Sequence, residues 1–211
     1  MITDPVALFL HMVKRAPVIL FALSFHELAH AWLADRLGDP TARRAGRISL
    51  NPLRHLDPIG TIALFFFPFG WAKPVPVNPY FLRRQIRDFA LTALAGPVAN
   101  LIAGLAFGLV SRLLAVFHVG GFFLELVQLS VLMNFALALF NLIPIPPLDG
   151  SRVLYYLLPS RYGSEYIKLE RFGIFIVLGL VLLDQTVPVL NIWMDPVIIL
   201  LCRLSAGRAI I

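Results

Sequence analysis

Long apolar segments dominate this chain, and they determine the solvent in which it can fold. Hydrophobic residues make up 59% of its 211 residues and charged residues only 14%, with a mean hydropathy of +0.82. Soluble domains carry roughly 25% charged residues, so the chain lacks the polar surface of a water-soluble globule. Several apolar runs approach or reach the ~18–20 residues that span a bilayer. The sequence therefore predicts one integral-membrane domain over residues 1–211, an all-α, polytopic helical bundle of about five to six spans.

Apolar length and proline positions divide the chain into spans and connections. Five spans are expected, over residues 16–37, 88–117, 121–142, 164–183 and 189–204. The apolar stretch 58–69 is too short to span, which suits a re-entrant segment. Weak alternation favours a short strand or hairpin over 41–55 at the membrane surface. Prolines make 70–83 an extended loop and exclude regular helix over 141–150.

The most specific local pattern is the H-E-x-x-H of His26, Glu27 and His30, which lies inside the first predicted span. On a helix, positions i and i+4 share one face, so both imidazoles can reach one metal ion. Glu27 follows the first histidine and is placed to take a proton from a metal-bound water. A hydrolytic zinc motif in an apolar segment indicates a protease that works at membrane depth.

A catalytic zinc site needs a third protein ligand and one open position for water. The candidates are His11, His55, His118 and several carboxylates, of which Asp149 is the strongest. It follows a proline-interrupted segment at the end of a predicted span, where an ionisable side chain is costly unless it has a partner. A divalent cation would be that partner. The alternative is a loop aspartate that caps a helix beginning near Ser151.

Two motifs in this order resemble the site-2 protease family of intramembrane zinc metalloproteases. The first is the H-E-x-x-H, and the second is the N-x-x-P-x-x-x-L-D-G of residues 141–150. Further stretches look like the short, minimal members without a PDZ or CBS domain, so that the resemblance covers most of residues 17–152. These stretches are Arg47 to Pro52, His55 to Thr61, Gly70 to Pro76 and Gly96 to Asn100.

The resemblance implies a ligand set and a reaction. His26, His30 and Asp149 would bind one Zn²⁺ per chain, with Glu27 as general base and later proton donor. Asn141 would hydrogen-bond the substrate backbone or help to hold the developing oxyanion. The substrate would be a transmembrane helix of another protein, cut within or near the bilayer after local unwinding. Extended segments near 47–52 and 72–77 could then pair with the unwound strand.

Asn100 has two interpretations from sequence. It hydrogen-bonds within the active-site cavity, as a second substrate or oxyanion contact, or it serves as a polar contact between helices, which is a common use of an amide in membrane proteins. The sequence alone leaves both open.

Two rival functions remain open at this point. One is a membrane zincin of another type, such as a prenyl-protein protease, in which the third ligand would be a glutamate or histidine and not Asp149. The other is an inactive protease-like scaffold, channel or transporter that uses His26 and His30 for structure. The intact Glu27 argues against the second rival, because a structural zinc site has no use for a base.

The formal charge of +6 reflects membrane topology, and we expect no nucleic-acid partner. If 58–69 is re-entrant, all but three of the 18 lysines and arginines fall on one side; the exceptions are Lys14, Arg15 and Arg112. That split fits the excess of basic residues on cytoplasmic loops. We therefore expect a protein of the prokaryotic cell (plasma) membrane whose active site faces the cytoplasm, and a homo-oligomer is left open. The single cysteine, Cys202, excludes an internal disulfide.

Overall fold

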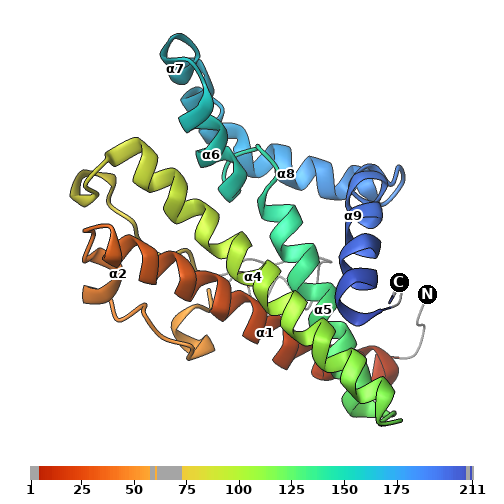
Figure 1. Cartoon of the computed structure of the whole chain (residues 1–211). Helices are drawn as coiled ribbons and strands as arrows, with labels where there is room; N and C mark the ends of the chain where they lie inside the picture. The colour runs from red at the N-terminus through yellow and green to blue at the C-terminus, as the bar shows by residue number, and fades with distance from the viewer. Residues whose placement is uncertain (1–4, 58–59, 61–72, 208–209, 211) are drawn as a thin grey trace.

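The computed structural model describes residues 5–57, 60, 73–207 and 210, and within them the protein is helical (Figure 1). The helices are α1 (Pro5–Arg36), α2 (Thr41–Arg44), α4 (Gln85–Val116), α5 (Phe122–Asn141), α6 (Asp149–Leu157), α7 (Ser160–Lys168), α8 (Glu170–Asp184) and α9 (Val189–Ala206). Two 3₁₀ turns, η1 (Pro52–Arg54) and η2 (Pro79–Phe81), lie in the connection between α2 and α4. The predicted all-α membrane class is confirmed.

Four of the described helices are long and apolar enough to cross a bilayer: residues 15–36 of α1, and α4, α5 and α9. Their outward faces carry exposed Ile102, Leu109 and Leu113 on α4 and Leu204 on α9, which suits contact with lipid. Helix α8 has 15 residues, fewer than the ~17–25 of a typical span. The described residues thus supply four candidate spans, against five to six expected.

Helix α4 forms the centre of the bundle because one of its faces is lined with small residues. Gly96, Asn100, Gly104 and Gly108 recur every fourth position, and this spacing puts them on one face. A Cβ at Gly104 would lie 2.4 Å from the Phe135 ring on α5, and one at Gly108 would lie 2.2 Å from the α9 hydroxyl of Ser205. In lipid no hydrophobic driving force brings helices together, so their association depends on close packing. Small residues allow the helix backbones to approach closely enough for it.

Helices α1 and α4 run antiparallel. The ring of Phe21, in the middle of α1, meets that of Phe107, in the second half of α4, edge to face at 5.6 Å. His30, near the end of α1, contacts Thr92, near the start of α4. Helix α9 ends beside the second half of α4, because Gly207 faces Arg112. The start of α1 and the end of α9 lie on the same side of Figure 1.

This arrangement corrects the predicted position of Arg203. Helix α9 begins beside the 142–148 loop, since Leu190 packs in one core cluster with Ile143 and Leu148. Helix α9 therefore ends beside Arg112, which lies near the end of α4. Arg84, the residue before α4, lies at the opposite end of the bundle. The prediction that Arg203 shares a side with the arginines at 83–87 is wrong, because α8 is too short to carry the chain back across the bundle.

The predicted strand or hairpin over 41–55 is also wrong. Pro40 precedes the single turn of α2, and the Asn51 side chain accepts a hydrogen bond from the Leu53 amide to begin η1. Local turn chemistry thus outweighs the weak alternation. Within the described part of the chain the only bridge residue is Leu56, and no strand forms. The predicted re-entrant segment at 58–69 lies outside the described residues apart from residue 60.

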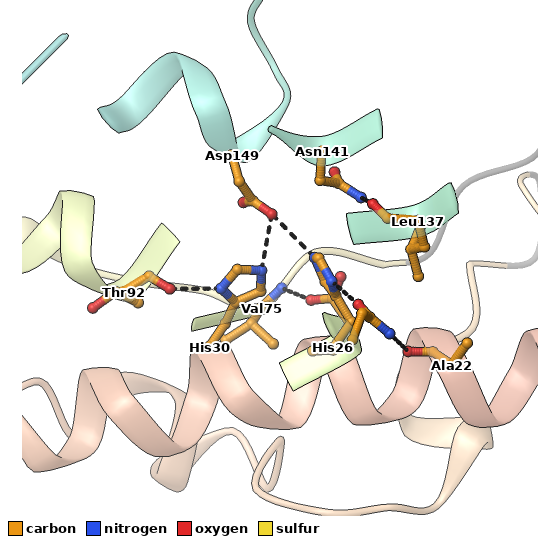
Figure 2. Close-up of polar contacts among 10 residues, drawn as sticks. Ala22, His26, His30, Val75, Thr92, Leu137, Asn141 and Asp149 are labelled. Carbon is orange, nitrogen blue, oxygen red and sulfur yellow. Dashed lines mark hydrogen bonds and ion pairs between the residues drawn. The ribbon is translucent and has the colours of Figure 1, made fainter. Parts of the chain in front are cut away.

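The predicted span at 164–183 is divided at Leu169 into α7 and α8. The irregular segment expected over 141–150 is confirmed for residues 142–148, which carry three prolines. Helix α6 starts tightly against this loop. A Cβ at Gly150 would lie 2.2 Å from the carbonyl oxygen of Leu142, so only glycine fits there. This contact places the first residue of α6, Asp149, over α1 (Figure 2).

Candidate metal centre

Two imidazoles project from one face of α1. The ring centroids of His26 and His30 are 4.6 Å apart, with the ring planes at 84°. Only 4% of His26 and 8% of His30 is exposed. Ala22, one turn earlier, is buried as well, so this face of α1 points into the protein. The helical spacing of the H-E-x-x-H motif therefore brings two nitrogen ligands together in a dry environment.

Asp149 completes a cluster of three ligand atoms. Its Oδ2 lies 3.1 Å from His26 Nε2 and 3.3 Å from His30 Nε2, and all three atoms lie within 4.8 Å of one another (Figure 2). Two ligands of a tetrahedral zinc ion, each at roughly 2.0–2.1 Å, stand about 3.3 Å apart. The separations and the N,N,O donor set thus fit a zinc ion, with a fourth position left for water.

Each imidazole is fixed through its second nitrogen. His30 Nδ1 donates to the carbonyl oxygen of Thr92 at 2.7 Å, and His26 Nδ1 donates to the Asn100 Oδ1 at 2.6 Å. The Asn100 amide nitrogen donates to the Ala22 carbonyl, which can only accept, so the orientation of this amide is determined. Because Nδ1 carries a proton in both rings, the Nε2 atoms, which face Asp149, are the ones that would bind a metal ion.

Gly96 leaves the space that a metal ion would need. A Cβ at this position would lie 2.4 Å from His30 Nε2 and 2.6 Å from His26 Nε2. Real Cβ atoms essentially never approach so closely, so any side chain here would displace the ligands. The backbone of α4 therefore forms one wall of the centre without occupying it.

The Asp149 side chain is ionised in this setting. Burial alone would raise its pKa, but the facing imidazoles of His30 and His26 favour the carboxylate and hold the pKa at about 2. A carboxylate must be deprotonated to bind a metal, so Asp149 is ready to act as a ligand at neutral pH.

Glu27 lies beside the cluster and makes a contact that the sequence analysis missed. Its Oε2 accepts a hydrogen bond of 3.1 Å from the amide of Val75, which lies 48 positions further along the chain. The contact is drawn at Val75 in Figure 2. The signal that could have revealed it is the pair of prolines on either side of Val75, which leaves one amide donor in that stretch.

The remaining candidates are placed elsewhere. Asn141, the last residue of α5, lies near Asp149 in Figure 2, and its amide nitrogen donates to the Leu137 carbonyl at 2.9 Å. His55 binds the Ser49 carbonyl through Nε2 in the loop before residue 58. His118 is exposed after α4, and the His11 side chain lies outside the described part. Neither His55 nor His118 joins the ligand cluster.

Comparison with known proteins identifies the family. Residues 115–183 match peptidase family M50. The YwhC protein of Bacillus subtilis (strain 168), named as a candidate zinc metalloprotease, is 39% identical over 196 residues, which cover 85% of this chain and 87% of the relative. The chain belongs to peptidase family M50, the site-2 protease family. The resemblance seen in the sequence and the expected enzyme class, a zinc metalloprotease, are thereby confirmed.

Two further relatives extend the comparison. Rip2 of Mycobacterium tuberculosis (strain ATCC 25618 / H37Rv), also named as a candidate zinc metalloprotease, is 32% identical and covers 88% of this chain and 71% of the relative. Zinc metalloprotease MJ0392 of Methanocaldococcus jannaschii is 29% identical over 71% of this chain and 37% of its own length. No solved structure matches the chain significantly. As an M50 zinc metalloprotease with four apolar helices, the protein is a membrane enzyme, as expected.

Proposed function

We propose that His26, His30 and Asp149 hold the catalytic zinc, and that the enzyme hydrolyses peptide bonds in transmembrane segments of other membrane proteins. The observation that carries this proposal is the position of Asp149 Oδ2, at 3.1 and 3.3 Å from the two Nε2 atoms. A metalloprotease whose third ligand is a different residue would not need this carboxylate against the imidazoles.

Bound at this centre, zinc supplies Lewis acidity, because it polarises the scissile carbonyl and acidifies the attacking water. Glu27 is the general base. Its Oε2 is engaged by Val75, while Oε1 accepts no hydrogen bond from the described residues. Oε1 therefore takes the proton of the attacking water and then delivers it to the leaving amide nitrogen. A non-catalytic scaffold would have no use for such a group, which disfavours the inactive rival.

Two asparagines take separate roles in this proposal. Asn100 is fully buried and orients His26, so it acts on the ligand rather than on the substrate. Its second donor reaches Asn134 on α5 at 2.8 Å, which also makes it a contact between helices. Asn141 is partly buried and lies near Asp149, and its side-chain oxygen is placed to accept from a substrate amide. To donate to an oxyanion, its amide must leave the Leu137 carbonyl.

The substrate must reach the centre as an extended strand, because the carbonyls of a helix are engaged in internal hydrogen bonds. The segments near 47–52 and 72–77 were expected to offer a free edge for it. Residues 73 and 74 do not, because the Lys73 amide donates to the His55 carbonyl and the Lys73 and Pro74 carbonyls accept from Arg47. We therefore assign substrate pairing to other backbone groups, with Asn141 as one contact.

The exposed arginines support one orientation in the membrane. His30 lies six residues before Arg36 at the end of α1, which is about 9 Å along the helix axis. Exposed Arg43, Arg44, Arg83 and Arg84 lie in the connections at this end. Basic residues concentrate on cytoplasmic loops, so we place this end, and access to the centre, in the cytoplasm of a prokaryotic cell.

Fragment analysis in cells tests the proposal. Membrane-protein fragments are compared between cells with the wild-type enzyme and cells with Glu27→Gln, and cleavage sites are mapped. Loss of the base is expected to slow cleavage by about 10²–10⁴-fold while one zinc per chain is retained. Glu125→Gln, which removes an exposed carboxylate at the start of α5, is the matched control. Identical fragments in the Glu27→Gln and wild-type cells would favour the scaffold function.

A further inference from the structure

Residues 73–76, here called the 73–76 segment, form an irregular stretch that contacts Glu27 through Val75. Two of its four residues, Pro74 and Pro76, have no amide hydrogen. Val75 is thus the only donor within the Pro-Val-Pro sequence, and that donor points at Glu27 Oε2. A shift of the segment by one residue in either direction would present a proline nitrogen and lose the contact.

The 73–76 segment is held in register by a buried arginine. Arg47 is only 6% exposed, and its Nη2 donates to the Lys73 oxygen at 2.6 Å and the Pro74 oxygen at 2.8 Å. No carboxylate pairs with Arg47 among the residues that the structure describes. A buried guanidinium that serves two consecutive carbonyls is costly to desolvate, so it marks a place where backbone position matters.

A second anchor acts just before Val75. The Lys73 amide donates to the His55 carbonyl at 2.8 Å, and His55 itself is fixed through Nε2 to the Ser49 carbonyl at 2.7 Å. The backbone on the N-terminal side of Val75 is therefore fixed on both of its edges, by Arg47 and by His55. The next amide along the segment, that of Val75, is bonded to Glu27, the residue after the ligand His26.

We propose that the Val75 amide, held in register by Arg47, is the positioning group for the general base Glu27. The hydrogen bond to Oε2 fixes the carboxylate plane and leaves Oε1 for the proton of the attacking water. Val75 and Arg47 are positioning residues, since they act through Glu27 and touch no reacting atom. This inference rests on the proposed function, which supplies the role of Glu27.

The expected consequence is specific to turnover. A carboxylate that accepts a hydrogen bond from a fixed backbone amide loses rotational freedom, and charge-assisted bonds of this kind are stronger than neutral ones. Without it Glu27 samples unproductive orientations, so fewer bound complexes have the base in place. The rate of the chemical step should fall, while zinc binding through His26, His30 and Asp149 and substrate affinity remain unchanged.

An infrared measurement tests the contact without any substrate. The difference spectrum between each protein and its Glu27→Gln counterpart isolates the carboxylate bands of Glu27. Val75→Pro removes the amide donor and should shift the antisymmetric carboxylate band, while Val75→Ala keeps the donor and should leave the band in place. An unshifted band in folded, zinc-loaded Val75→Pro would overturn the proposal. So would an equal shift in both variants.

Kinetics test the role in catalysis, with a membrane protein taken from the fragment comparison as substrate. Val75→Pro should lower kcat by about tenfold or more at unchanged KM and zinc content, and Val75→Ala should keep the wild-type kcat. If Val75→Pro loses its zinc or does not fold, Arg47→Lys decides, because lysine keeps the charge but is one bond shorter, so its nitrogen does not reach the position of Nη2. It should lower kcat with zinc retained, whereas Arg44→Lys, at an exposed site, should not.

A wild-type kcat in Arg47→Lys would contradict the proposal. Failure of the proposed function would give a different result. The wild type would then cleave no substrate, or Glu27→Gln would cleave the substrate as fast as the wild type. The infrared result on Val75 stands independently of that outcome.

Discussion

The Asn100 side-chain oxygen lies 2.6 Å from His26 Nδ1, and this contact joins the metal centre to the middle of the bundle. Asn100 comes from α4, His26 from α1, and the Asn100 amide nitrogen also reaches Asn134 on α5. All three side chains are buried. The packing of three membrane helices is therefore coupled to the orientation of one ligand.

Replacing Asn100 by leucine should weaken zinc binding. Leucine has a similar size but cannot accept the proton of His26 Nδ1, so the imidazole loses its fixed tautomer and orientation. Loss of such a partner typically costs about 10–100-fold in metal affinity. Competition with a chelator of known affinity measures the change. Asn141→Leu is the control, and it should keep wild-type zinc affinity; wild-type affinity in Asn100→Leu would show that the contact does not orient the ligand.

Gly96→Ala should strongly weaken zinc binding for a steric reason. The new Cβ would lie within 2.6 Å of three ring atoms of His26 and His30, so the ligands must separate. We expect a loss of zinc affinity of about 100-fold or more, beyond what the loss of an orienting partner causes. Metal analysis of the purified protein and chelator competition measure it.

Gly104→Ala is the matched control for Gly96→Ala, because it adds the same methyl group to the same face of α4 against Phe135. It should lower stability by roughly 1–3 kcal/mol through overpacking, yet keep one zinc per chain. If both variants lose zinc equally, general damage to α4 and not the space above the imidazoles explains the effect.

Much of the site could be predicted from sequence because its strongest signals are local. The i, i+4 spacing of His26 and His30 depends only on α1 being a helix, and Gly150 after Asp149 indicates a close backbone approach. The Val75 contact with Glu27 could not be predicted, because it depends on where a loop folds back 48 residues later. Asn100 was a candidate, but its partner depends on how α4 crosses α1.

The errors in the fold have the same origin. The side of the membrane on which Arg203 lies was predicted from a count of spans. That count changes because one helix, α8, is too short to cross. The strand expected at 41–55 rested on alternation over a few residues, which the caps of Pro40 and Asn51 override. Periodicity reports the environment of a segment, while topology depends on contacts between distant segments.

Asp149→Ala should remove the metal and thereby separate this enzyme from a zincin with a different third ligand. Zinc content is expected to fall well below one per chain, because two imidazoles alone leave an incomplete coordination shell. Asp195→Ala, which removes a carboxylate from α9, should keep its zinc. One tightly bound zinc per chain in Asp149→Ala would show that another residue is the third ligand.

Cysteine accessibility tests both the orientation and the corrected position of Arg203. The native Cys202 is fully buried, so it should give no background with a membrane-impermeant maleimide. If the arginine-rich end faces the cytoplasm, Arg44→Cys should react only after the cells are permeabilised. Gly120→Cys, in the open turn between α4 and α5, should react in intact cells.

Because α9 runs parallel to α4, Arg203→Cys should behave like Gly120→Cys, whereas the five-span interpretation requires it to behave like Arg44→Cys. Labelling of Arg44→Cys in intact cells would reverse the proposed orientation.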